Sequence, residues 1–298
     1  MNVIMFSGQG AQKAGMGKDF YDNFAVAKQT FEEASDALGM DVAKLCFEDA
    51  DGLLAKTEYA QPALVTAGIA AYRSLQQEGV NADLLMGLSL GEYTALVAAE
   101  VLEFARTVKL VHRRGLLMTQ LAAEGGMAAV MGLKRDVVEE ICKKAQSAGY
   151  VACANFNTSE QIVISGEKAA LDACVPLIKE AKGKTIALKV SGPFHTKLMQ
   201  AAADAFVAEM ADITPKTAIL PIISNVTAYV LATDNLAQHL AQHMTGSVLW
   251  SDSVAKAKQL GGTKFIELGC GNTLVNFVKK IDDTLETYAI EKAGEVRQ

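Results

Sequence analysis

The chain has 298 residues, which is enough for two domains of ordinary size or for one large α/β domain. Half of the residues are hydrophobic and 21% are charged, a balance too apolar for a disordered chain and typical of a globular protein with a buried core. The formal net charge of −6, without any run of more than two lysines or arginines, argues against a protein that binds nucleic acid through a basic face.

The first part of the chain alternates short apolar runs with amphipathic stretches. Val3–Ser7 has the pattern of a buried strand that ends at Gly8, and Asn81–Met86 is a second such run. Amphipathic helices are predicted over 22–38, 57–77 and 104–121. The residues after Leu90 also suit a helix, so a strand, a sharp turn and a helix are expected to meet at Gly87–Gly91.

Residues 126–190 have a separate pattern of predicted strands and helices. Strands are predicted over 127–133, 150–155, 161–165 and 185–190, and helices over 136–145 and 168–181. This β-α-β-β-α-β sequence is the ferredoxin-like order. We therefore expect a small domain, residues 126–190, inserted into a larger α/β domain formed by 1–125 and 191–298.

The larger α/β pattern resumes after Pro193. Further buried strands are predicted over 218–224 and 264–268, and helices over 235–245, 251–260 and 272–285. The polar tail from Glu291 is expected to fray.

The five cysteines include no C-x-x-C pair, which disfavours a disulfide framework or a zinc site and favours a reducing compartment. No signal peptide and no apolar run of membrane-spanning length stand out in this sequence. A cytoplasmic monomer without a metal or a membrane contact is the expectation.

The segment Gly87-Leu88-Ser89-Leu90-Gly91 matches G-x-S-x-G. A serine on a tight strand-to-helix turn is pushed out of the sheet, and the next backbone N–H can stabilise a developing oxyanion. The alternative is a glycine-rich turn with an incidental serine. The predicted strand and helix on either side favour a nucleophile at Ser89.

A serine nucleophile needs a base, and the chain has four histidines. His112 lies on a predicted helix beside two arginines. His239 and His243 are four residues apart on another helix but lack the glutamate of H-E-x-x-H and an evident third ligand, so they are interpreted as part of a solvated helix face. His195 follows a predicted strand, where catalytic side chains often lie, but its position alone leaves a structural role equally open.

Gly8-Gln9-Gly10 also follows a strand. The spacing is not that of a dinucleotide-binding or P-loop motif, so nucleotide binding is disfavoured. A second oxyanion donor, the backbone N–H of Gln9, and a plain tight turn both remain open.

Together, these segments resemble the malonyl-CoA:acyl-carrier-protein transacylases of fatty-acid synthesis and the related acyltransferase domains of polyketide synthases. The similar segments run in the family's order over nearly the whole chain: 6–12, 61–64, 87–93, 114–115, 157–166, 192–195 and 267–269. Each segment alone is weak evidence, but the ordered set is specific.

The resemblance implies an α/β-hydrolase-like core with a ferredoxin-like insertion, and a role for each matching residue. Ser89 would be the nucleophile and His195 the base. The oxyanion hole would consist of the backbone N–H groups of Gln9 and Leu90. Further roles fall to Arg114 as the clamp on the substrate carboxylate, to Gln61 as a lining residue, to Asn157 near the histidine, to Phe194 as a bulky group that crowds an α-methyl branch, and to the Leu249 carbonyl as the acceptor that orients the histidine.

The sequence departs from the family's pattern at two places. Leu88 stands where the family usually has histidine, and Ser159-Glu160 replaces a common Pro-Gly, which weakens the match at Asn157. Arg113, next to the clamp candidate, is interpreted as a solvated helix charge.

The function implied by the resemblance is transfer of a malonyl group from malonyl-CoA to the phosphopantetheine thiol of acyl-carrier protein, through a malonyl-serine and without a bound cofactor. A carrier protein of polyketide synthesis is an alternative acceptor. A serine hydrolase shares the G-x-S-x-G turn but would need an oxyanion motif of the HGGG type, which is missing. A carrier-protein docking subunit with a vestigial site has only Leu88 in its favour.

Overall fold

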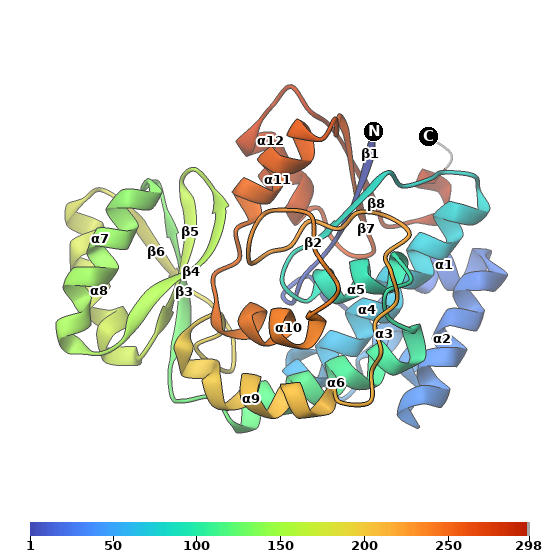
Figure 1. The fold of residues 1–298 in the computed structure, drawn as a ribbon, viewed down its shortest axis with the longest axis horizontal. Coiled ribbons are helices and arrows are strands. Elements are labelled where there is room, and N and C mark those ends of the chain that lie inside the picture. The colour runs from blue at the N-terminus through green and yellow to red at the C-terminus, as the bar shows by residue number, and fades with distance from the viewer. Residues whose placement is uncertain (297–298) are drawn as a thin grey trace.

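The computed structural model describes residues 1–296 and forms a mixed α/β structure with two sheets (Figure 1). Residues 126–187 build one sheet and two helices, which we call the small unit. The remaining described residues, 1–125 and 188–296, form the large unit.

A parallel sheet of four strands, in the order β2-β1-β7-β8, lies at the centre of the large unit. Its strands are β1 (Asn2–Phe6), β2 (Leu84–Gly87), β7 (Lys264–Leu268) and β8 (Glu286–Ile290). Phe6 pairs with Gly87 on one side and with Leu268 on the other, so the carboxyl ends of three strands lie side by side. In open α/β sheets ligands bind at this edge.

Helices cover both faces of this sheet. They are α1 (Lys18–Asn23), α2 (Ala25–Leu38), α3 (Val42–Glu48), α4 (Thr57–Gln77), α5 (Gly91–Ala98), α6 (Phe104–Gln120), α9 (Gln200–Glu209), α10 (Leu236–Thr245), α11 (Trp250–Gln259) and α12 (Thr273–Ile281). Alternate residues of β1 enter two separate apolar clusters, Ile4 and Phe6 in one and Val3 and Met5 in the other. Burial on both faces explains why β1 reads as a continuous apolar run.

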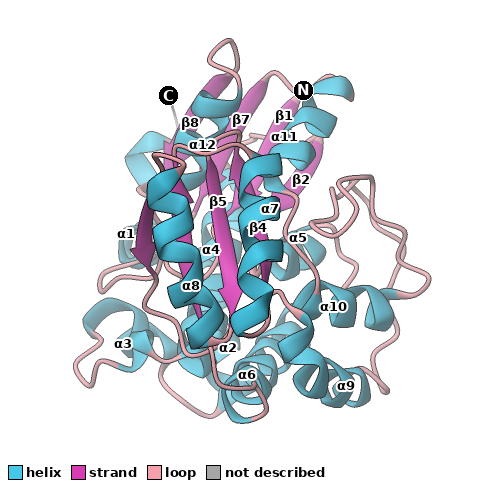
Figure 2. Ribbon diagram, turned by 90° about the vertical axis from the view of Figure 1, so that its left-hand side faces the viewer, coloured by secondary structure: helices cyan, strands magenta, loops and turns pink. Residues whose placement is uncertain are grey.

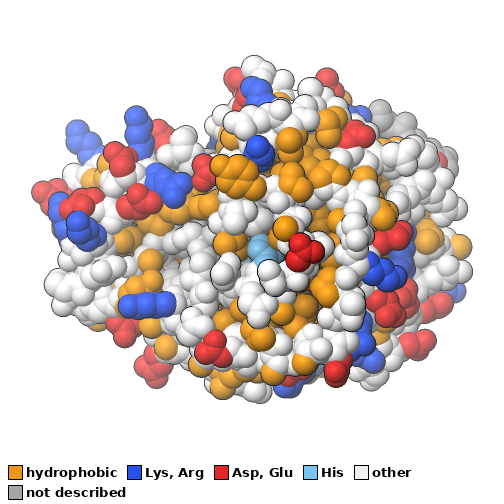
Figure 3. Space-filling model, in the orientation of Figure 1, with side chains coloured by type: hydrophobic (Ala, Val, Ile, Leu, Met, Phe, Trp, Pro, Cys, Tyr) orange, Lys and Arg blue, Asp and Glu red, His pale blue; other side chains and the backbone are white. Residues whose placement is uncertain are grey.

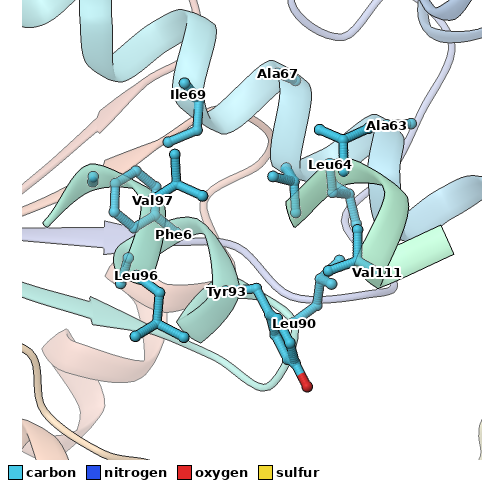
Figure 4. Close-up of a cluster of buried hydrophobic side chains, with 14 of the residues drawn as sticks. Phe6, Ala63, Leu64, Ala67, Ile69, Leu90, Tyr93, Leu96, Val97 and Val111 are labelled. Atoms are coloured by element: carbon cyan, nitrogen blue, oxygen red, sulfur yellow. The ribbon is translucent and has the colours of Figure 1, made fainter. Parts of the chain in front are cut away.

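The helix that follows the serine turn is anchored in the larger of these clusters (Figure 4). Phe6 of β1 lies against Leu96 and Val97 of α5, while side chains of α4 close the other side. Tyr93, also on α5, directs its hydroxyl away from the apolar side chains. Tight packing of this kind holds the first turn of α5 in a fixed place under the sheet edge.

The small unit contains β3 (Gly126–Met131), α7 (Arg135–Ala145), β4 (Val151–Thr158), β5 (Gln161–Gly166), α8 (Lys168–Glu180) and β6 (Lys184–Ala187). Its sheet has the order β4-β5-β3-β6, and each neighbouring pair is antiparallel. Helices α7 and α8 cover one face of this sheet, the face turned away from the large unit (Figure 2). A third apolar cluster fills the space between them.

Strand β4 joins the two units through backbone hydrogen bonds. Phe156 N–H donates to the Val248 carbonyl at 2.9 Å, and Val248 N–H donates to the Ala154 carbonyl at 2.8 Å. Ser247 adds a side-chain hydrogen bond to the Cys153 carbonyl at 2.7 Å. The small unit is thus attached by sheet-like pairing in addition to its two chain connections.

The strand predicted over 218–224 is wrong. Ile222 and Ile223 form only isolated bridges, to Leu85 of β2 and to Val230. Pro221 lacks an N–H, although its carbonyl accepts a hydrogen bond from Leu85 N–H at 2.9 Å, so the pairing does not extend into a ladder.

Other boundaries also differ from the prediction. The helix expected over 22–38 is two helices, because Phe24 is extended between α1 and α2. Helix α12 ends at Ile281, and β8, which the sequence did not indicate, follows it. The tail from Glu291 is held rather than frayed as far as it is described, because Glu295 accepts hydrogen bonds from the backbone N–H groups of Glu291 and Lys292.

Within residues 1–296, no helix combines the length and the apolar composition needed to cross a membrane. The same residues hold no group of three or more histidine, cysteine or acidic side chains arranged to bind a metal ion.

Candidate active site

The G-x-S-x-G segment forms a sharp turn between β2 and α5. Ser89 adopts a φ of 52°, a left-handed conformation that is strained for a residue with a side chain. The two glycines are required by close backbone contacts, because a Cβ on Gly87 would lie 1.9 Å from the Gly91 carbonyl carbon and a Cβ on Gly91 would lie 2.1 Å from the Phe6 carbonyl oxygen. Strained residues of this kind concentrate at functional sites.

His195 lies beside the serine although 106 residues separate them in the chain. Ser89 Oγ and His195 Nε2 are 2.8 Å apart, and His195 itself has a φ of 60°. The histidine is buried, and burial together with the nearby positive charge of Arg114 lowers the pKa of His195 to about 4. Its imidazole is therefore neutral near pH 7 and is available to accept the serine proton.

The carbonyl that orients His195 belongs to His243 and not to Leu249. His195 Nδ1 lies 2.9 Å from the His243 carbonyl oxygen. The Leu249 carbonyl instead accepts hydrogen bonds from Ser253, through its N–H and its hydroxyl. Leu249 is the N-cap residue of α11, and its carbonyl is used in the first turn of that helix.

His239 and His243 do not form a solvated helix face. The His243 side chain is 1% exposed, and burial is the main cause that holds its pKa well below the usual value. His239 Nε2 lies 2.5 Å from Oε1 of Glu92, a buried carboxylate on α5. His243 Nε2 in turn lies 3.4 Å from Asn225 Oδ1, so both rings contact buried polar groups next to the serine turn, and their spacing of four residues places them on one face of α10.

Arg114 is buried on α6 with only 1% of its surface exposed. Its Nη1 donates to Gln61 Oε1 at 2.9 Å, and its guanidinium lies 5.0 Å from the centre of the Tyr93 ring. Nε and Nη2 have no hydrogen-bond partner among residues 1–296, and neither has the Tyr93 hydroxyl. Two adjacent buried N–H donors of one guanidinium form the fork that a carboxylate accepts.

A chain of side-chain hydrogen bonds connects Arg114 to the loop after β1. Gln61 Nε2 donates to Gln9 Oε1 at 3.3 Å, and Gln9 Nε2 donates to Thr57 Oγ1 at 3.0 Å. Gln61 is thus placed between the guanidinium and the Gly8-Gln9-Gly10 turn. By contrast, Arg113 is half-exposed and pairs with Glu209 at 2.8 Å, as the solvated-charge interpretation expects.

Phe194 and Asn157 are buried but less directly connected to the dyad. Phe194 precedes His195 and packs in the large apolar cluster. Asn157 lies on β4, and its Oδ1 has no hydrogen-bond partner within the described part of the chain.

Two residues that the sequence did not single out also contact the site. Asn225 accepts a hydrogen bond from Ser89 N–H at 2.6 Å, and Glu92 accepts one from Asn225 N–H at 2.6 Å. Glu92 lies in the family-like segment 87–93 but was given no role there, whereas no motif marks Asn225, which lies 136 positions from Ser89.

One face of the molecule shows a histidine side chain near its centre, with hydrophobic and uncharged surface around it and an acidic side chain close beside it (Figure 3). Acidic and basic side chains are mixed on the left of this view, over the small unit.

Comparison with known proteins agrees with this geometry. The family described as "Acyl transferase domain" matches residues 3–294. The chain is 39% identical to a protein named malonyl CoA-acyl carrier protein transacylase from Bacillus subtilis strain 168, covering 97% of this chain and 92% of the relative. A protein of the same name from Staphylococcus aureus strain MRSA252 is 38% identical, over 99% of this chain and 97% of the relative.

Solved structures show the same similarity. A malonyl CoA-acyl carrier protein transacylase from Clostridium perfringens superposes with a TM-score of 0.97 at 40% identity, covering 99% of this chain and 95% of that one. A chain in the solved complex of a type II PKS acyl-carrier protein with its malonyl-transacylase matches with a TM-score of 0.96 at 34% identity. The match covers 99% of this chain and 97% of that chain. The chain belongs to the malonyl-CoA:acyl-carrier-protein transacylase family of acyltransferases.

Proposed function

We propose that this chain transfers a malonyl group from malonyl-CoA to the phosphopantetheine thiol of acyl-carrier protein, through a malonyl ester of Ser89. The observation that carries the proposal is a serine–histidine dyad with a 2.8 Å contact, together with a buried arginine that has two unpaired N–H groups. The names of the relatives and the neighbouring complex with an acyl-carrier protein support the same substrates.

In the first half-reaction, neutral His195 takes the proton of Ser89 Oγ as the oxygen attacks the thioester carbon of malonyl-CoA. The backbone N–H groups of Gln9 and Leu90 stabilise the oxyanion, aided by the N-terminal end of α5. The C–S bond then breaks, and CoA leaves as a thiol with the proton from His195. The carrier thiol attacks the malonyl ester in the same way and regenerates Ser89.

Arg114 selects the acyl group in this proposal. Malonyl differs from acetyl by one carboxylate, which Nε and Nη2 of Arg114 would bind in a bidentate manner. An acetyl group would leave both buried donors unpaired, and unpaired buried donors penalise the wrong substrate strongly. Phe194 would exclude an α-methyl branch, and Asn157 would line the site near His195.

The proposal includes the finer fold. A ferredoxin-like domain over 126–190, inserted into an α/β-hydrolase-like core of 1–125 and 191–298, is supported by the antiparallel strand order β4-β5-β3-β6 and by the parallel central sheet. Five free cysteine thiols support a cytoplasmic location, where thiols stay reduced. No bound cofactor takes part in the proposed reaction.

The test is a mass measurement of the intact protein after incubation with malonyl-CoA, methylmalonyl-CoA or acetyl-CoA. We expect a malonyl adduct on the unaltered chain and none on Ser89→Ala, with Ser74→Ala, a buried serine on α4, as the control that keeps the adduct. Undiminished labelling of Ser89→Ala would refute the proposal. Steady release of malonate without a thiol acceptor would instead favour a hydrolase.

Transfer of the adduct to carrier proteins separates the possible acceptors. The labelled enzyme is mixed with phosphopantetheinylated carriers from fatty-acid and from polyketide synthesis, and the mass of each carrier is followed. Transfer to at least one of them is expected.

A further inference from the structure

The serine turn is held by one side chain from a distant loop. Asn225 Oδ1 accepts from Ser89 N–H at 2.6 Å, and Asn225 Nδ2 donates to the Gly87 carbonyl at 2.7 Å. The amide therefore bonds the backbone before and at the nucleophile, using its acceptor on one side and its donor on the other. These two hydrogen bonds fix the backbone on either side of Leu88, where the chain enters the strained φ of Ser89.

The backbone N–H and carbonyl oxygen of Asn225 are hydrogen-bonded as well. Its N–H donates to Glu92 Oε2 at 2.6 Å, and its carbonyl accepts from Leu249 N–H at 2.8 Å. Oδ1 also lies 3.4 Å from His243 Nε2, and the carbonyl of His243 is the group that orients His195. One buried amide thus contacts the nucleophile's backbone and the residue that orients the base.

Glu92 is the group that holds Asn225 in place. This carboxylate is fully buried on the first turn of α5, one turn beyond Ser89, and it holds Asn225 with one oxygen and His239 with the other. A buried carboxylate is costly unless its oxygens are hydrogen-bonded, so its two partners have a structural reason to be present.

We infer that Asn225 is the positioning residue of the active site, which holds Ser89 in its strained conformation and in register with His195, and that Glu92 and His239 fix Asn225. This inference rests on the proposed role of Ser89 as nucleophile. The hydrogen bonds of Asn225 go to the serine turn, Glu92, His243 and Leu249. Arg114 is held separately, by Gln61. Loss of the Asn225 amide should therefore slow the chemical step and leave substrate binding nearly unchanged.

The decisive measurement is the rate of Ser89 acylation by malonyl-CoA, resolved into kcat and KM, in Asn225→Ala and in the isosteric Asn225→Asp. Misplacing a reacting group by about 1 Å costs about 100-fold in rate, so we expect kcat for Asn225→Ala to fall by about that factor with KM changed less than about threefold. Asn225→Asp keeps an acceptor for Ser89 N–H but turns a carboxylate oxygen toward the Gly87 carbonyl. We expect its kcat to fall at least about tenfold in a folded protein.

Three further variants test the positioning role. Glu92→Gln keeps an acceptor for Asn225 N–H and should retain most of the rate, whereas Glu92→Ala should lose it. Ser74→Ala, a buried residue on α4 whose hydroxyl, within residues 1–296, bonds only the Ala70 carbonyl, is the matched control and should leave kcat per folded molecule unchanged. A wild-type kcat in both Asn225 variants would overturn the inference, and so would an equal loss of rate in Glu92→Gln and Glu92→Ala.

Failure of this inference is distinguishable from failure of the proposed function. If Ser89→Ala is not acylated while both Asn225 variants react at the wild-type rate, only the positioning role is refuted. If Ser89→Ala is acylated as fast as the unaltered chain, the proposed nucleophile is wrong.

Discussion

The two units of the molecule have sheets of the same size but interiors of opposite character. The buried ionisable groups of the described chain other than cysteine and tyrosine, namely Glu92, Arg114, His195, His243 and Glu267, all belong to the large unit. The small unit encloses aliphatic side chains and three cysteines, and its buried polar residues are uncharged. Its β6 strand is mostly exposed, whereas β1 and β2 are almost completely buried.

This difference shows where buried charge is tolerated. The large unit holds Ser89 and His195 at positive φ and has charge-assisted hydrogen bonds close to them. Such features persist only where the surrounding structure over-determines them, and the large apolar clusters supply that constraint. The small unit is stabilised by ordinary apolar packing and contacts the large unit through the pairing of β4 with residues 247–248.

The largest expected effect is removal of the base from the large unit. Replacing His195 by alanine removes the acceptor of the Ser89 proton, and general base catalysis contributes about 100- to 10,000-fold. We expect the rate of Ser89 acylation, measured by rapid quench and mass spectrometry, to fall by a factor in that range. A loss of less than tenfold in a folded protein would contradict the role of His195.

Arg114→Ala should abolish the preference for malonyl over acetyl groups. Truncating one partner of a buried charge pair costs about 2 to 5 kcal/mol, so kcat/KM for malonyl-CoA should fall by about 30- to 5,000-fold. Acetyl-CoA lacks the carboxylate, so its kcat/KM should not fall with it. Arg113→Ala is the matched control, since its half-exposed side chain pairs with Glu209. Unchanged selectivity in Arg114→Ala would rule out the clamp.

The small unit should respond in stability and not in chemistry. Ile164 is fully buried in its apolar cluster, and Ile→Ala substitutions in cores cost about 2 to 5 kcal/mol. Denaturant unfolding of Ile164→Ala should show a loss in that range, while the acylation rate per folded molecule stays within about twofold. A large loss of rate in the folded variant would mean that the small unit also positions the reacting groups.

The pH dependence tests the environment of His195. Because its pKa is lowered to about 4, kcat/KM for malonyl-CoA should stay level down to about pH 5, where an ordinary histidine with a pKa of about 6.5 would be about 97% protonated and inactive. Between pH 6.5 and 4 the unfolded state binds a proton that folded His195 does not. The free energy of unfolding therefore decreases as the pH is lowered through this window. Rates are therefore normalised to the folded fraction by circular dichroism. An acid limb centred at pH 6.5 would contradict the lowered pKa.

The smallest expected effect concerns an ion pair across the boundary of the units. Arg135 of α7 and Asp252 of α11 are 3.2 Å apart, and both side chains are about half-exposed. Exposed pairs contribute about 0 to 1 kcal/mol, so Asp252→Asn should change the free energy of unfolding by no more than that. A larger loss would show that this contact, and not only the pairing of β4 with 247–248, holds the units together.

Much of this protein was readable in the sequence because the signals are local. A strand, two glycines and a helix around Ser89 mark the strand-to-helix turn in the local sequence, although the close contact that requires Gly91 is made with Phe6 of β1. The order of strands and helices over 126–187 follows from hydrophobic periodicity, with boundaries displaced by a few residues. The family resemblance added the roles of His195 and Arg114, which their positions alone left open.

Only the tertiary structure decided which groups surround the serine. A backbone carbonyl has no residue signature, so the acceptor for His195 could be found only in the fold, at His243 and not at Leu249. Asn225 carries no motif and Glu92 had no predicted role, and their contacts join segments more than 130 residues apart. The sequence analysis placed His239 and His243 on a solvated helix face, but the fold pairs them with Glu92 and Asn225. The cost of burying these polar groups is removed only when their hydrogen bonds are formed.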